Sequence, residues 1–246
     1  MAAASSTILD NVYARSVTWP FKWIFWGLTF LSISWCLAIL FACTGHLWLW
    51  RELGAEGSLE QVNRAWVFLI GDSLGTVEVS SGKVQQGAHL LFWCSEKAYE
   101  VIFIWTGFEK TFFMAVSGMA ADGLDKAFYR YLATHRDTVE VAMMATRLWG
   151  AKLALVFTSA PLFLAAFAVA VVDGLVLRHI RTVNGGRESS TLYHRSKYLS
   201  VMLAGTTMML ILLLPINIYP SIVLPLLALC TGFFARVQWQ YFKKYI

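Results

Sequence analysis

Charge is scarce in this chain. Only 14% of its 246 residues are Asp, Glu, Lys or Arg, and 58% are hydrophobic. Soluble domains carry about 25% charged residues. The apolar residues are gathered in blocks and do not recur at the period of a surface helix or strand. This composition excludes an ordinary soluble domain and predicts an all-α integral membrane protein.

Motifs for metal or nucleotide chemistry are also missing. The four cysteines, Cys36, Cys43, Cys94 and Cys230, show no CxxC or Cys/His spacing, so neither a zinc site nor a disulfide framework is predicted. The five histidines form no HExxH pair, and no GxxxxGK[ST] loop occurs. We therefore expect a protein that is not an enzyme and that holds no cofactor and no metal.

One catalytic motif is matched letter for letter. Gly71-Asp72-Ser73-Leu74 has the sequence of the serine motif of GDSL-type esterases. Those enzymes also need an Asp-x-x-His, and no Asp precedes any of the five histidines by three residues here. The stretch before Ser73 has a helical pattern, so we interpret the motif as a helix end and turn. A membrane-embedded hydrolase that uses Ser73 is the alternative.

Uncharged blocks predict four transmembrane helices. Residues 23–50 and 153–172 are long enough to cross a bilayer, which takes about 20 apolar residues. Tryptophans near both ends of the first block are typical of membrane interfaces, and the block is too long for the apolar core of a signal peptide. The block 198–235 holds Pro215 and Pro220 around Asn217, which predicts a hairpin of two spans that turns at 215–220.

The polar segment 51–152 is predicted to be mostly helical. Ser58 with Gln61 forms a capping-box pair, and the stretch 76–85 predicts a small hairpin. The aromatic-rich stretch 89–121 predicts helices that pack against the membrane helices or lie in the interface.

Two further helices follow in this segment. An amphipathic stripe is formed by Leu124, Phe128, Tyr131 and Leu132. Asp137 with Glu140 then opens a helix that meets no stop signal before Arg178. Its 42 residues would be about 60 Å long, which exceeds the thickness of the bilayer, so the helix should project beyond it.

The charges outside the spans predict the orientation. The lead 1–22 has a net charge of +1, the segment 51–152 of −2, the loop 173–197 of +3 and the tail 236–246 of +3. Basic residues near spans are retained in the cytoplasm. Four spans then place both termini inside and the segment 51–152 in the periplasm of a bacterial inner-membrane protein.

The basic loop is the predicted partner-contact surface. Its candidate residues are Arg178, Arg181, Arg187, His194, Arg195 and Lys197. Few aromatics are interleaved with them, so direct nucleic-acid binding is not expected, and retention of orientation alone also explains the charges. Ala165, Ala166, Ala168 and Ala170 offer a small-residue face for close helix packing, within the chain or with other membrane helices.

Short stretches of the second half form a recognisable set: DGLDKAFYRY at 122–131, DGLV at 173–176, GRESS at 186–190, YH at 193–194 and FKKY at 242–245. Together they resemble the integrating conjugative element membrane protein family, whose molecular function is unknown. Members are usually encoded beside the coupling ATPase of a type IV DNA-transfer system. The resemblance implies a role in conjugation and carries over no active-site residue.

The function favoured by these observations is that of a non-enzymatic inner-membrane accessory subunit of a type IV DNA-transfer apparatus. Its expected partners are membrane lipids and other membrane proteins of the complex, such as the coupling ATPase. Two alternatives remain open: a small transporter or pore component, and an exclusion factor that lowers DNA uptake by recipient cells. The spans carry no ionisable residue except His46, which argues against an ion path.

Overall fold

A computed structural model describes residues 2–48, 54–75, 83–118, 125–185, 190–215 and 219–242, and every regular element in these ranges is a helix. The elements are α1 (Ala2–Trp48), α2 (Gly54–Gly75), α3 (Lys83–Tyr99), the π-helix η2 (Glu100–Ile104), α4 (Phe108–Val116), α5 (Asp125–Thr134), α6 (Arg136–Val183), α7 (Ser190–Leu213) and α8 (Pro220–Gln240). The all-helical prediction is confirmed for this part of the chain.

Four of these helices are long and apolar enough to cross a membrane. The candidate spans are Ile24–Gly45, Arg136–Val183, Thr191–Leu213 and Pro220–Gln240. Each overlaps one of the predicted spans, so the predicted number of spans agrees with the number of candidate helices. The helix ends also agree with the predicted turn at 215–220, because α7 ends at Leu213 and α8 begins at Pro220; residues 216–218 lie outside the described residues.

Helix α6 is the longest element and contacts most of the other helices. It runs unbroken for 48 residues and includes Pro161, so the prediction of one long helix is confirmed, while its projection from the bilayer stays a prediction. Its charged residues Lys152 and Asp173 are 21 positions apart, which is about 31 Å of helix. A bilayer has a hydrocarbon core of about 30 Å. The uncharged stretch between these two residues therefore has the length of one membrane crossing.

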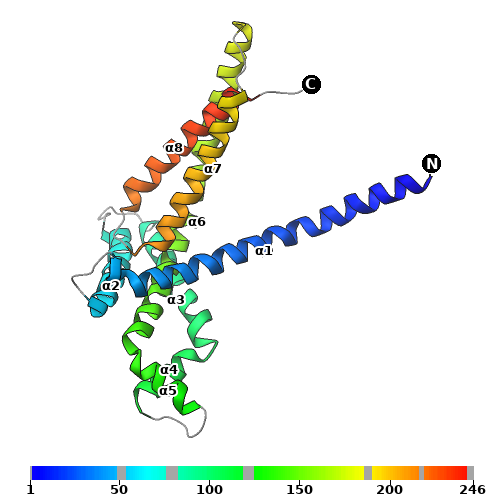
Figure 1. The fold of residues 1–246 in the computed structure, drawn as a ribbon. Helices are drawn as coiled ribbons and strands as arrows, with labels where there is room; N and C mark the ends of the chain where they lie inside the picture. The colour runs from blue at the N-terminus through cyan, green and yellow to red at the C-terminus, as the bar shows by residue number, and fades with distance from the viewer. Residues whose placement is uncertain are drawn as a thin grey trace.

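Helices α7 and α8 run beside the C-terminal part of α6, as Figure 1 shows. Small residues allow α6 and α8 to approach closely. A Cβ atom added at Gly174 would lie only 2.7 Å from the carbonyl oxygen of Arg236, and Gly232 lies against Ala166. The predicted small-residue face is thus used in part within the chain: Ala170 is buried and Ala166 half-buried, whereas Ala165 and Ala168 are exposed.

Helices α2 to α5 surround the other end of α6 (Figure 1). One core joins α1, α2 and α6 through Ala42, Val62, Ala65 and Val141, which are all at most 2% exposed. A second core holds aromatic residues of α3, η2 and α4 against Leu132 of α5 and Met143 of α6. The described part of the stretch 89–121, which ends at residue 118, therefore packs against α6 and α5, one of the two placements that its sequence predicts; residues 119–121 lie outside the described residues.

Helix α1 meets the other helices only along part of its length and then runs away from them (Figure 1). Its contact with α6 is reciprocal. Trp35 Nε1 donates to Thr146 Oγ1 at 3.0 Å, and Trp149 Nε1 donates to Ser34 Oγ at 3.2 Å. Ser34 and Thr146 are fully buried, so these bonds fix the register of the two helices.

Several local predictions are wrong. Helix α2 begins at Gly54, so Ser58 is a buried residue inside the helix and not its cap. The small hairpin predicted over 76–85 is wrong at its end, because residues 83–85 belong to α3, which begins at Lys83. Residues 76–82 lie outside the described residues.

The start of α6 and the face of α5 also differ from expectation. His135 is the N-cap of α6 and makes no side-chain cap bond, while Glu140 pairs with Arg136 and not with the backbone of Asp137. In α5 the packed face includes Leu132 and Tyr129; Phe128 and Tyr131 of the predicted stripe are exposed, and the side chain of Leu124 is outside the described part.

Candidate functional site at the basic end of the bundle

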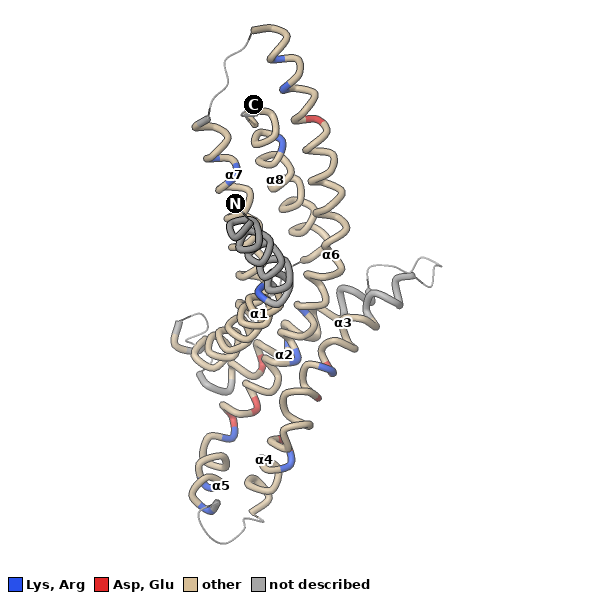
Figure 2. The backbone as a smooth tube through the Cα atoms, turned by 90° about the vertical axis from the view of Figure 1, so that its right-hand side faces the viewer, with Lys and Arg blue, Asp and Glu red and all other residues tan. Residues whose placement is uncertain are grey.

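One end of the α6–α7–α8 bundle is strongly basic. Its described charged residues are Arg178 and Arg181 at the end of α6, Arg195 and Lys197 at the start of α7, Arg236 near the end of α8, and the carboxylate Asp173. Figure 2 shows these basic positions at the upper end of the three helices, whereas the opposite end around α2 to α5 carries both signs. Four positive charges are left in excess at this end.

Arg181 is held against the end of α8. Its Nη2 donates to the carbonyl oxygen of Gln240 at 2.6 Å, and its guanidinium lies 4.2 Å from the centre of the Tyr241 ring.

 The last carbonyls of a helix lack partners within it, and a cation there complements the helix dipole. Arg181 therefore closes the C-terminus of α8. Among the residues that the structure describes, none accepts a hydrogen bond from its buried Nε and Nη1.

The ring of Phe242 joins all three helices. It lies 5.6 Å from the Arg178 guanidinium of α6, 5.7 Å from the Tyr193 ring of α7 and 5.6 Å from the Trp239 ring of α8, measured between centres. A cation over an aromatic face is stabilised by the ring quadrupole. Arg178 and Arg181 thus take part in holding the bundle together.

The other predicted contact residues face outward. His194, Arg195 and Lys197 are exposed near the start of α7, and the His194 ring lies against that of Tyr193. Arg187 lies outside the described residues. The structure therefore divides the predicted set into two arginines used inside the fold and three exposed side chains free to meet a partner.

An ion pair and a groove lie on another side of this end. Asp173 of α6 is paired with Arg236 of α8, and both side chains are more than a third exposed. A groove of about 530 Å³ runs from this pair along α6 and α8 as far as Leu162 and Pro225. Apart from the ion pair, its lining is apolar.

A lysine closes α7, at the opposite end of the bundle. Lys152 is 4% exposed, and its Nζ donates to the carbonyl oxygen of Leu214, just past the last residue of α7. Helix α6 therefore supplies a capping side chain to each of its two neighbours: Lys152 to α7 and Arg181 to α8. The hairpin of α7 and α8 is fastened to α6 at both ends.

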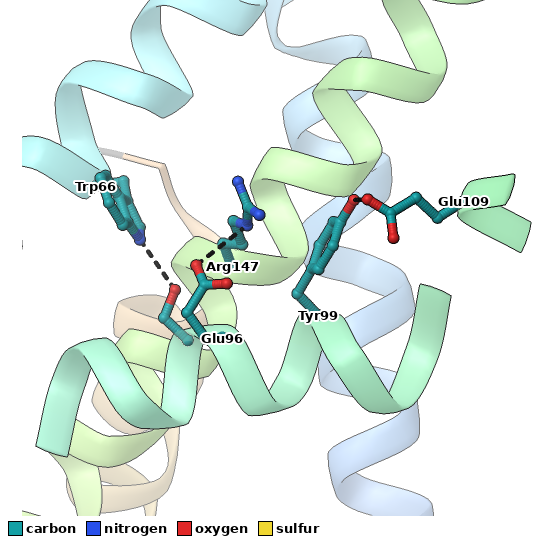
Figure 3. Close-up of polar contacts among 6 residues, drawn as sticks. Trp66, Glu96, Tyr99, Glu109 and Arg147 are labelled. Carbon is teal, nitrogen blue, oxygen red and sulfur yellow. Dashed lines mark hydrogen bonds and ion pairs between the residues drawn. The ribbon is translucent and has the colours of Figure 1, made fainter. Parts of the chain in front are cut away.

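Polar contacts also fasten α3 to α6 and α2 (Figure 3). The guanidinium of Arg147 lies 4.1 Å from the centre of the Tyr99 ring, and its Nε is 3.4 Å from Glu96 Oε1. Trp66 Nε1 donates to Ser95 Oγ at 3.0 Å. Burial, together with the hydrogen bond that the phenol donates to Glu109, raises the pKa of Tyr99 to about 12.

Sequence reasoning missed the residues of α8 at the basic end. Arg236 was counted only as a charge of the tail, and Trp239, Tyr241 and Phe242 were given no role. The spacing of Gly174, Arg178 and Arg181 at i, i+4 and i+7 places them on one helix face and was the available signal. Which helix covers that face is a matter of tertiary packing.

Ser73 lies within α2, and its side chain is outside the described part of the chain. Helix α2 continues to Gly75, so the helix end expected at Gly71 and Asp72 lies slightly later. Within the described ranges, no three His, Cys, Asp or Glu side chains gather in a metal-binding group.

Comparison with known proteins gives a family match. A family model described as "IncC plasmid conjugative DNA transfer protein DtrJ-like" matches residues 49–243. No curated protein and no solved structure matches the chain. The match confirms the conjugation-associated part of the resemblance seen in the sequence. Its assignment to integrating conjugative elements stays a prediction.

Proposed function

The chain belongs to the DtrJ-like family of conjugative DNA transfer proteins, and from that premise we propose that it is a non-enzymatic accessory subunit of the transfer apparatus in the bacterial inner membrane. In this proposal the basic end faces the cytoplasm and docks the coupling ATPase or another subunit of the inner-membrane complex. The helices α2 to α5 then form its periplasmic part.

The exposed basic side chains of α7 carry the proposal. His194, Arg195 and Lys197 are exposed, whereas Arg181 contacts the end of α8 and Arg178 contacts Phe242 just past it. Complementary charges steer association and set the register of an interface. An acidic surface on a cytoplasmic partner is therefore the expected counterpart of these three side chains.

The placement of the membrane supports this orientation. The uncharged stretch between Lys152 and Asp173 matches the hydrocarbon core in length, so the basic end lies immediately outside one face of it. Lys and Arg close to spans favour the cytoplasmic side. The residues of α6 before Lys152 then project from the other face, packed against α1, α2 and α3.

The test is a double substitution, Arg195→Ala with Lys197→Ala, in donor cells. We expect normal protein abundance and a fall in transfer frequency of about tenfold or more, because two exposed charge contacts are lost. The matched control, Lys110→Ala with Arg130→Ala, removes two exposed charges from α4 and α5 at the opposite end and should leave transfer unchanged.

Two further measurements complete this test. Arg181→Ala should lower abundance, because it uncaps α8. A photo-crosslinker at His194 should capture the coupling ATPase or a secretion subunit. Normal transfer in the α7 double variant would overturn the docking surface.

A further inference from the structure

The groove between α6 and α8 has a polar end and an apolar body. Its floor is made of small residues, with Ala170 and Ala228 buried and Gly232 against Ala166. Its rim carries large apolar side chains that have little cover within the chain: Val169 and Leu229 are each 69% exposed.

The length of the groove matches one leaflet of a bilayer. Leu162 and Asp173 are 11 positions apart, which is about 16 Å along α6. Half of the hydrocarbon core is about 15 Å. The groove therefore begins at the boundary set by the Asp173–Arg236 pair and ends near the middle of the membrane, where a lipid acyl chain of that leaflet also ends.

The charge at the mouth selects the head group. A guanidinium has five N–H donors, so one carboxylate does not exhaust Arg236. The surrounding end of the bundle carries four positive charges in excess. Basic pockets between transmembrane helices bind anionic head groups.

We propose that this groove binds an anionic phospholipid, with an acyl chain along α6 and α8 and its phosphate at Arg236. The lipid covers the exposed rim in the leaflet of the basic end. The tails of the bilayer are as apolar as the groove, so burial alone gives little preference for one lipid. Selectivity therefore comes from the charge of the head group, and each basic residue near the surface raises the affinity for an anionic lipid about fivefold.

The proposal is tested on the full-length protein, stripped of lipid in detergent and titrated with phosphatidylglycerol or phosphatidylcholine under native mass spectrometry. We expect phosphatidylglycerol to bind about fivefold more tightly. Ala165→Trp fills the groove and should abolish the bound species. Ala168→Trp is the matched control, since Ala168 is exposed on the same helix and does not line the groove.

Substitutions of the two partners of the ion pair should change the affinity for phosphatidylglycerol in opposite directions. Arg236→Gln removes the phosphate partner and should weaken phosphatidylglycerol binding about fivefold, whereas Asp173→Asn removes a competing carboxylate and should strengthen it about fivefold. A purely structural ion pair would give changes of the same sign in both variants, and that outcome would overturn the proposal. Equal binding of both lipids, or equal binding by the two tryptophan variants, would do so as well.

A second copy of the chain is the competing occupant. If Ala165→Trp converted a dimer into a monomer without changing lipid binding, the groove would be a protein interface and the lipid site would be wrong. The groove lies apart from His194, Arg195 and Lys197, so loss of lipid with normal crosslinking at His194 would leave the proposed docking function standing.

Discussion

Among single residues, two long basic side chains of α6 hold its neighbouring helices. Lys152 and Arg181 each donate to a carbonyl oxygen at the end of another helix, Leu214 for α7 and Gln240 for α8. Both positions are visible in the sequence as charges flanking an apolar block. Their partners are 62 and 59 residues away along the chain, so no local pattern identifies them.

Tyr99 gives a prediction for the pH dependence. Its pKa of about 12 lies above the usual value of 10 for a phenol, because burial and Glu109 favour the neutral form in the folded protein. Below pH 10 the phenol is neutral in both states and its stabilising effect is complete. The effect is lost as the pH rises through about 12, since only the unfolded chain ionises freely.

The measurement is the absorbance of tyrosinate during an alkaline titration of the protein in micelles. The difference between the wild type and Tyr99→Phe isolates this one side chain among the nine tyrosines. A midpoint near 12 is expected. A midpoint near 10 would show that Tyr99 is not held by Glu109 in the folded protein.

At the scale of elements, close approach of α6 to α3 depends on a glycine. A Cβ atom added at Gly150 would lie 2.7 Å from the Ala98 Cβ and 2.8 Å from the carbonyl oxygen of Cys94. The backbone of α3 cannot yield to such a contact without moving the helix. Gly150→Ala is therefore expected to destabilise the protein by about 1–3 kcal/mol.

The matched control for Gly150→Ala is Gly205→Ala in α7. A Cβ at Gly205 meets nothing within 4 Å, and alanine is the better helix former, so this change should be neutral or stabilising by up to about 1 kcal/mol. Thermal unfolding in micelles compares the two. Equal melting temperatures for both variants would contradict the close packing of α3 on α6.

The elements were predicted well where length and charge decide them. The uninterrupted pattern after Asp137 predicts a helix of 42 residues, close to the 48 residues of α6, and Pro215 and Pro220 predict the turn between α7 and α8. The Ser58 cap was wrong because α2 begins one turn earlier. A capping-box sequence is a local signal, and the packing of Ser58 into the protein overrides it.

At the scale of the whole molecule, α1 follows a different path from the other candidate spans. Residues 34–43 of α1 run beside α6 from Trp149 to Thr138, on the side of Lys152 that carries α2 to α5. Among the side chains of α1 that the structure describes before residue 31, the large apolar ones are exposed, including Ile24, Phe25 and Trp26. An apolar helix without cover is stable in lipid, so the membrane replaces the neighbours that α1 lacks.

The orientation of the molecule follows from its charges and is the last prediction. The basic end, with Arg195, is expected in the cytoplasm, and the end that carries Arg130 of α5 is expected in the periplasm. Single cysteines at these two exposed positions, in a chain whose four native cysteines are replaced by serine or alanine, report the side directly.

A membrane-impermeant maleimide should label Arg130→Cys in cells whose outer membrane alone is opened. It should label Arg195→Cys only after the inner membrane is also broken, because about 31 Å of apolar helix separates Lys152 from Asp173. The reverse pattern would place the exposed cations of α7 outside the cell interior and remove the proposed contact with a cytoplasmic ATPase. Labelling of both positions from one side would mean that the α6–α7–α8 bundle does not cross the membrane as a unit.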